Sequence, residues 1–211
     1  MLSFKNFKKS YGSFPALKVP DLTLDPGIYW IKGVNGSGKS TLLKSIAGIL
    51  SFDGDILLDN SVSIKNDAVA YRKLVNFSEA EALFPEFITG TELIDLFISA
   101  KGGPKGQEQS LIDSMKMQAF VGRPVGTYSS GMLKKLSLLL AFLGQPKVIL
   151  LDEPLITIDT ASLEILYSWI AGRHRNSGTT FLLTSHQALD ASILPEARQL
   201  LVEEQTLKSL G

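Results

Sequence analysis

The sequence predicts an α/β fold, in which a mixed or parallel sheet is combined with an N-terminal antiparallel β region and an inserted helical subdomain. Three observations predict it. A glycine-rich turn at residues 33–38 follows a short apolar strand and precedes a helical segment. A second apolar strand, at residues 148–151, ends in two acidic residues. Between these two features, residues 79–145 place apolar side chains at helical spacing, which identifies them as an insert.

The first third of the chain carries short apolar runs bounded by glycine, proline or polar residues, a pattern that favours strands. We expect strands at residues 3–7, 22–24, 28–31, 55–58 and 74–77. The segment 40–49 has the pattern of a helix whose N-terminus faces the glycine-rich turn.

The remainder of the chain alternates between helix and strand. Helices are expected at residues 91–100, 110–120 and 161–171, with a strongly apolar stretch at 136–143, and late strands at 181–184 and 200–202. The apolar stretch is followed by Gly144 and Pro146, which end its helix. We therefore expect a single domain divided into a core, residues 1–78 and 147–211, and an inserted helical subdomain, residues 79–146.

Composition limits the function classes. The 211 residues suffice for one domain with a sizeable core. Lysine plus arginine equal aspartate plus glutamate at 21 each, so the formal net charge is zero and no nucleic-acid partner is expected. The absence of cysteine excludes disulfides and thiolate metal sites. No apolar run approaches the ~20 residues of a membrane span, so we expect a soluble, cytoplasmic protein.

The glycine-rich turn has the composition of a phosphate-binding loop. Its glycines let successive backbone N–H groups point at one anion, its lysine adds a mobile positive charge, and a serine hydroxyl after the lysine suits Mg²⁺. The expected nucleotide-binding residues are Gly33, Asn35, Gly36, Ser37, Gly38, Lys39, Ser40 and Thr41, with Ser40 also a metal ligand. The preceding strand and following helix are the context that this motif requires, so we expect a bound nucleoside triphosphate.

The strand at residues 148–151 ends in Asp152 and Glu153, as a central parallel strand does when its carboxyl end reaches a phosphate site. Asp152 is placed to hold the metal through its water shell. Glu153, one residue further, is placed to accept a proton from the water that attacks the γ-phosphate. Taken alone, the pair is equally explained as a solvated turn.

The segment 128–132, Tyr-Ser-Ser-Gly-Met, precedes an amphipathic helix and supplies a helix N-terminus with free N–H donors. With the two motifs above, it resembles the ATP-binding-cassette family, whose signature segment usually reads Leu-Ser-Gly-Gly-Gln. The chain departs from that pattern at Tyr128, Ser130 and Met132 and keeps Ser129 and Gly131. The resemblance covers nearly the whole chain and implies a P-loop NTPase (RecA-like) core, with Ser129, Ser130 and Gly131 contacting nucleotide.

Four further roles are implied by the resemblance. Tyr11 matches an aromatic ring stacked on adenine, and His186 matches a histidine that hydrogen-bonds the γ-phosphate. Glu79 stands where the family has a glutamine that touches Mg²⁺ and the attacking water. A surface acid with no role in the site would give the same sequence pattern. Asp159 matches a residue that reaches across two subunits, and it also suits the N-cap of the helix at 161–171. The other histidine, His174, is expected in a solvated loop.

The resemblance also implies a mechanism. Two subunits meet head to tail, so that each ATP lies between the phosphate loop of one and the signature segment of the other. The partner is expected to be a second nucleotide-binding subunit, taken as a homodimer. A separate membrane permease carries the transported substrate, and Phe84 or Phe87 in the segment 82–89 is a candidate contact for it. The chain would then be peripheral at the inner face of the cell membrane, and it looks most like exporter subunits.

Three alternatives stay open. A cassette protein acting on ribosomes or nucleic acid usually carries two cassettes or a long coiled-coil insert, and neither is seen. A P-loop small-molecule kinase would leave the signature segment and His186 unexplained. A protein that binds ATP and regulates without turnover is compatible with Ser130, Met132 and Glu79.

Overall fold

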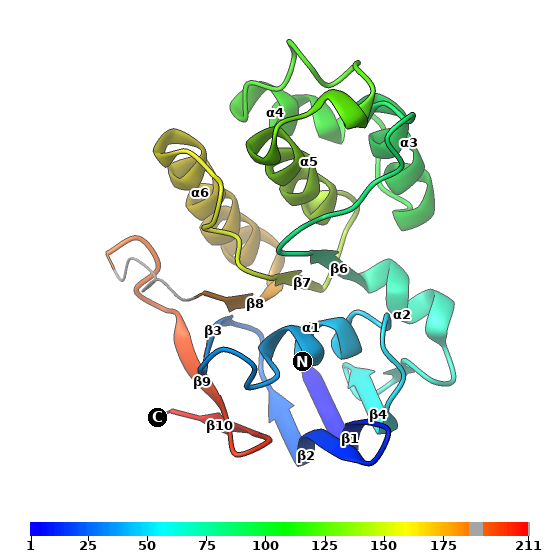
Figure 1. Ribbon diagram of the computed structural model, residues 1–211, viewed down its shortest axis with the longest axis vertical. Helices are drawn as coiled ribbons and strands as arrows, with labels where there is room; N and C mark the ends of the chain where they lie inside the picture. Colours follow the sequence, from blue (N-terminus) through cyan, green and yellow to red (C-terminus); the bar gives the residue numbers. More distant parts are fainter. Residues whose placement is uncertain (186–191, 211) are drawn as a thin grey trace.

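The computed structural model describes residues 1–185 and 192–210 and contains two sheets (Figure 1). The first is antiparallel, with the strand order β2-β1-β4-β5. Its strands are β1 (Leu2–Tyr11), β2 (Phe14–Leu24), β4 (Asp53–Leu58) and β5 (Val62–Ser63). This sheet confirms the antiparallel β region expected near the N-terminus.

The second sheet is mixed and has the order β10-β9-β3-β8-β7-β6. Its strands are β3 (Ile28–Lys32), β6 (Val75–Ser78), β7 (Val148–Leu151), β8 (Thr180–Thr184), β9 (Arg198–Glu203) and β10 (Thr206–Ser209). All neighbours are parallel except β10, which is antiparallel to β9. The carboxyl ends of the five parallel strands therefore lie at one edge, where ligands bind in open α/β sheets.

Apolar side chains cover both faces of this sheet, as expected for buried parallel strands. Along β7 they alternate: Val148 and Leu150 join a core shared with α1 and the antiparallel sheet, whereas Ile149 and Leu151 join a core shared with the later helices. The helices are α1 (Lys39–Ile46), α2 (Ala68–Leu74), α3 (Gly90–Lys101), α4 (Gln107–Ser114), α5 (Ser130–Phe142) and α6 (Thr160–Ser177), with a 3₁₀ turn at Val125–Thr127. Figure 1 shows α3, α4 and α5 at one end of the molecule and the antiparallel sheet at the other, with the mixed sheet between them.

The helices α3, α4 and α5 all lie between β6 and β7 in the chain. Of these, α5 packs directly on β6 and β7, and its buried residues Leu136, Leu139 and Leu140 belong to the same core as Ile149. The helical segment and the sheet thus share apolar packing, and the division at residues 78/79 and 146/147 stays a prediction.

Several element boundaries differ from those expected. The helix predicted at 110–120 ends at Ser114, because Lys116 adopts a left-handed conformation with φ 56°. The strand predicted at 22–24 extends back to Phe14, since Pro15 and Pro20 are tolerated in an edge strand. The prediction of a solvated loop at His174 is wrong.

His174 lies in the last turn of α6, which continues to Ser177 rather than ending at 171. Its Nδ1 lies 2.9 Å from the carbonyl oxygen of Thr179. The helix stops where Gly178 adopts φ 64°, a conformation that glycine reaches without steric penalty.

Candidate functional site

The phosphate loop joins β3 to α1 and passes too close to its surroundings to carry side chains at every position. A Cβ added to Gly33, whose φ is 152°, would lie 2.5 Å from Ser37 Oγ and 2.6 Å from the carbonyl oxygen of Val202. Gly38 precedes α1 at φ 106°, and a Cβ there would lie 3.1 Å from Leu17. Both positions therefore require glycine.

The side chain of Lys39 folds back over this loop. Its Nζ donates to the carbonyl oxygens of Gly33, at 2.8 Å, and Val34, at 3.2 Å. Ser37 contributes a buried hydroxyl that has no hydrogen-bond partner among the residues the structure describes. Ser40, one residue into α1, is exposed. The loop thus presents one ammonium and two hydroxyls near a helix N-terminus, which is an arrangement that binds phosphate.

The acids at the end of β7 are held by a threonine from the neighbouring strand. Asp152 and Glu153 are both buried. Thr184 Oγ1, at the end of β8, donates to Asp152 Oδ1 at 2.6 Å and accepts the backbone N–H of Glu153 at 3.0 Å. Glu153 has φ 45°, which is uncommon outside glycine and asparagine. Its backbone conformation therefore depends on the contacts that surround it.

A lysine of α5 binds the backbone at the same edge of the sheet. Lys134 is 3% exposed, and its Nζ donates to the carbonyl oxygens of Glu79, Ala80 and Asp152 at 3.2 to 3.3 Å. Burial lowers the pKa of Lys134 to about 8, although the acids nearby oppose this shift.

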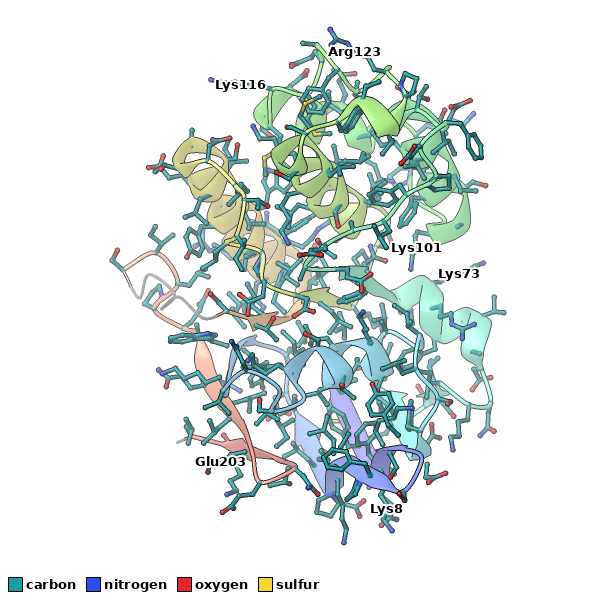
Figure 2. The ribbon with its side chains drawn as sticks, viewed as in Figure 1. Lys8, Lys73, Lys101, Lys116, Arg123 and Glu203 are labelled. Atoms are coloured by element: carbon teal, nitrogen blue, oxygen red, sulfur yellow. The ribbon has the colours of Figure 1, made fainter. Side chains whose placement is uncertain are left out.

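Two hollows border the phosphate loop. The larger, of about 670 Å³, is lined by the loop glycines, Tyr11, the end of β9 with Glu203 (labelled in Figure 2) and the turn that leads to β10. Tyr11 is 51% exposed there, and its hydroxyl lies 3.3 Å from Thr41 Oγ1. The smaller, of about 280 Å³, brings Glu153 together with Lys39, Ser40 and their neighbours in the loop. The structure thus joins the loop and the second acid, which lie more than 100 residues apart in the sequence.

The segment 128–132 begins α5. Ser129 is exposed and caps the helix, with its Oγ accepting the N–H of Met132 at 3.3 Å. Tyr128 is buried instead, and its hydroxyl donates to the carbonyl oxygens of Phe120 and Val121. Neither hollow beside the phosphate loop is lined by a residue of this segment. Within the part of the chain described, the signature serines therefore face solvent rather than their own loop.

The remaining predicted residues have separate surroundings. The Glu79 carboxylate forms an ion pair with Lys44 of α1. Asp159 caps α6, because its carboxylate accepts the backbone N–H of Ser162 at 2.8 Å, and it pairs with Lys135 at 3.0 Å. These contacts lower the pKa of Asp159 to about 2, with the Ser162 N–H as the largest cause. The N-cap expected at Asp159 is confirmed, while His186, expected to bind the γ-phosphate, lies outside the described residues.

Thr184 and Lys134 were not among the site residues predicted from the sequence. A signal for Thr184 is its polar side chain at the end of an otherwise apolar strand. A signal for Lys134 is its helical spacing with the buried residues Leu138 and Ala141, which puts a lysine on an apolar face. Neither signal indicates which groups these side chains contact.

A glycine-rich loop between a strand and a helix, together with a buried carboxylate at the end of another parallel strand of the same sheet, defines a P-loop nucleoside triphosphatase. The chain belongs to the ABC transporter family, whose profile matches residues 17–156. It is an ATP-binding subunit of a transporter and an ATPase, and proteins of this family dimerise and work with a membrane permease.

Two relatives illustrate the similarity in sequence. The cytochrome c biogenesis ATP-binding export protein CcmA of Legionella pneumophila (strain Lens) is 37% identical over 166 residues, covering 77% of this chain and 80% of that protein. The ATP-binding cassette sub-family A member 7 of Mus musculus is 30% identical over 186 residues, which cover 85% of this chain and 8% of that protein.

Solved structures share the fold. An ATP-binding subunit of an ABC transporter superposes with a TM-score of 0.89 at 20% identity, covering 100% of this chain and 90% of that one. A dimeric post-hydrolysis cassette bound to ADP and Pi superposes with a TM-score of 0.80 at 21% identity, covering 100% and 99%. The expected α/β fold is thereby confirmed. No helix within residues 1–185 and 192–210 is long and apolar enough to cross a membrane.

Proposed function

We propose that two copies of this chain enclose two ATP molecules between them and that this closure powers transport through a separate permease chain. The observation that carries the proposal is the separation of the two phosphate-binding segments. Ser129 is exposed at the start of α5, whereas the hollows beside the phosphate loop are lined by other residues. A single chain therefore offers each segment to a different nucleotide, and a head-to-tail pair completes both sites.

In each subunit, the phosphate loop would hold the β- and γ-phosphates through the backbone N–H groups of residues 33–41 and the ammonium of Lys39. Lys39 now donates to two loop carbonyls, so it is already inside the cradle that the phosphates would enter. Tyr11 would stack on the adenine ring, because its half-exposed ring lines the larger hollow.

A Mg²⁺ ion suits the donors at this edge of the sheet. The Ser40 hydroxyl and the Asp152 carboxylate are oxygen ligands, which Mg²⁺ prefers. Two protein ligands are enough, because Mg²⁺ in such sites also keeps water molecules and phosphate oxygens as ligands. The carboxylate of Glu79 could join them only by leaving Lys44. When bound, Mg²⁺ would neutralise charge on the phosphates.

Glu153 would accept a proton from the attacking water. It lines the same hollow as Lys39 and Ser40, and Thr184 fixes its backbone. We propose that His186 assists by a hydrogen bond to the γ-phosphate. The partner's Ser129, the partner's Ser130 and the partner's Gly131 would close the site from the other side, and the partner's Asp159 would meet the loop across the boundary.

The permease would dock on the segment that follows β6. Leu83 and Phe87 are 92% and 85% exposed, whereas Phe84 packs against the core of the helical segment. Phe87 is thus the aromatic residue available to a short apolar helix of the permease. We propose that the chain works in this way at the inner face of the membrane and, by its similarity to an export protein, in export.

The test is to replace Glu153 by glutamine, which removes the base and keeps the side-chain shape. We expect ATP turnover to fall at least 100-fold, while ATP added with Mg²⁺ converts the monomer to a dimer visible by size exclusion with light scattering. ADP serves as the control nucleotide and should leave the variant monomeric. Unchanged turnover would remove Glu153 from its role, and a variant that stays monomeric at saturating ATP would contradict the shared site.

A further inference from the structure

Lys134 links the start of α5 by hydrogen bonds to the segments that follow β6 and β7, beside the nucleotide site. It lies one turn after the N-cap Ser129 in α5, and its three ammonium donors meet three carbonyl oxygens. Two of these, from Glu79 and Ala80, follow β6, and the third belongs to Asp152 at the end of β7. The count of donors equals the count of acceptors, so a buried charge is fully hydrogen-bonded at this position.

Neighbouring contacts make the arrangement continuous. One turn beyond Lys134, Ser137 Oγ lies 2.8 Å from Ser78 Oγ at the end of β6, and both side chains are buried. The backbone N–H of Asp152 in turn donates to the carbonyl oxygen of Ser78 at 2.9 Å. The start of α5 is therefore fastened to the ends of two strands rather than packed on them by apolar contact alone.

The same contacts lead toward the subunit's own phosphate loop. Glu79, whose carbonyl oxygen Lys134 holds, forms an ion pair through its carboxylate with Lys44. Lys44 lies in α1, the helix that begins at the phosphate loop. If α1 shifts when nucleotide binds, the Lys44–Glu79 ion pair would move Glu79 with it. The hydrogen bond between Lys134 and the Glu79 carbonyl oxygen would then shift the start of α5.

We propose that Lys134 is a positioning residue, which sets the placement of the signature segment offered to the partner according to the state of the subunit's own nucleotide site. It contacts neither nucleotide itself. The inference rests on the shared-site function proposed above, since Ser129 has to face a partner's phosphate for its placement to matter. Lys134 should accordingly affect dimer closure more than nucleotide binding by the monomer.

A second, partly buried lysine supplies a control. Lys101, at the end of α3 (labelled in Figure 2), also has its pKa lowered to about 8 by burial and also donates to backbone carbonyl oxygens, those of Arg72 and Val75. Arg72 lies in the last turn of α2 and Val75 begins β6, so both acceptors lie at or before the start of β6 rather than after its end, as Glu79 and Ala80 do. Replacing Lys101 by methionine removes comparable hydrogen bonds without touching the strand ends at the site.

The experiment compares Lys134→Met, Lys134→Arg and Lys101→Met, each combined with Glu153→Gln so that ATP is not consumed. Binding of a fluorescent ATP analogue to dilute monomer gives the affinity of the subunit's own site. Light scattering against protein concentration at saturating ATP gives the dimer dissociation constant. Thermal melting without nucleotide reports the structural effect of each substitution.

We expect Lys134→Met to raise the dimer dissociation constant at least tenfold while monomer affinity for the analogue stays within threefold. Lys134→Arg, which keeps the donors, should restore closure to within threefold. Lys101→Met should lower the melting temperature and leave the dimer dissociation constant unchanged. This pattern would distinguish positioning from a general loss of stability.

The proposal is overturned if the dimer dissociation constant of Lys134→Met equals that of the Glu153→Gln reference. It is equally overturned if Lys101→Met raises this constant as much as Lys134→Met does. It is also overturned if monomer affinity and closure fall together. Should Lys134→Met fail to fold, Lys134→Gln replaces it, because a neutral amide keeps only two donors and must still show a selective defect in closure. If the Glu153→Gln reference itself does not dimerise, the shared site fails and the inference fails with it, so the two failures are distinguished.

Discussion

Replacing Thr184 by valine would test how the two acids of the site are held. The change keeps the shape of a fully buried side chain and removes its hydroxyl, which donates to Asp152 Oδ1 and accepts the N–H of Glu153. Losing a hydrogen bond to a carboxylate and leaving a buried N–H without this acceptor should together destabilise the protein by about 2 to 4 kcal/mol. For a domain of this size the melting temperature should fall by about 4 to 16 °C.

Thr184→Val should also lower ATP turnover, by an effect that is separate from the loss of stability. Glu153 holds an uncommon backbone conformation, and without its anchor the carboxylate would lose alignment with the attacking water, so kcat should fall about 10- to 100-fold. The KM for ATP should stay within threefold, because the phosphate loop is untouched. Thermal melting and steady-state ATPase assays measure the two effects.

Thr179→Val is the matched control, because Thr179 is also buried and its hydroxyl donates to a neutral group, the carbonyl oxygen of Pro146 at 3.0 Å. It should cost only about 1 kcal/mol and leave kcat unchanged. Equal melting temperatures for the two variants, or wild-type turnover in Thr184→Val, would refute this reading of the strand ends.

Three further predictions concern the loop and its surroundings. Tyr11→Ala should weaken ATP binding about tenfold through lost stacking and change stability little, as titration calorimetry and melting would show; unchanged affinity would exclude stacking. Gly33→Ala should reduce ATP affinity at least tenfold because a Cβ would collide with the loop, whereas Gly172→Ala, with nothing within 4 Å, should not. Asp159→Ala should lower the free energy of unfolding by about 1 kcal/mol at pH 7. That difference should shrink as pH falls below about 4, the value of an unfolded aspartate, through the folded pKa of about 2; a constant difference in denaturation from pH 7 to pH 2 would contradict it.

The parts of the fold that sequence predicted are those coded by contiguous residues. The strand, turn and helix around Gly33, Gly38 and Lys39 follow from one unbroken motif, and the apolar run before Asp152 identifies a buried strand by itself. The short helix α2 and the strand β10 were missed. Each is brief, and β10 depends on pairing with β9 rather than on an apolar pattern of its own.

Parts of the site could not be predicted because they depend on contacts between distant segments. Thr184 meets Asp152 only because β8 lies beside β7, and Lys134 meets Glu79 only because α5 crosses the end of β6. The exposure of Ser129 likewise depends on which side of the helical segment faces solvent. Residue types were readable from the sequence, whereas hydrogen-bond partners needed the packed structure.

The shared site can be tested most directly by disulfide cross-linking, because the chain has no cysteine of its own. Asn35 and Ser129 are both exposed, the first in the phosphate loop and the second at the start of α5. One preparation carries Asn35→Cys and the other Ser129→Cys, each with Glu153→Gln, and the two are mixed under mild oxidation. The account predicts a cross-linked pair of chains that forms with ATP and Mg²⁺, only in the mixture and not with ADP. Absence of this product while both variants bind ATP, or equal cross-linking without nucleotide, would contradict it.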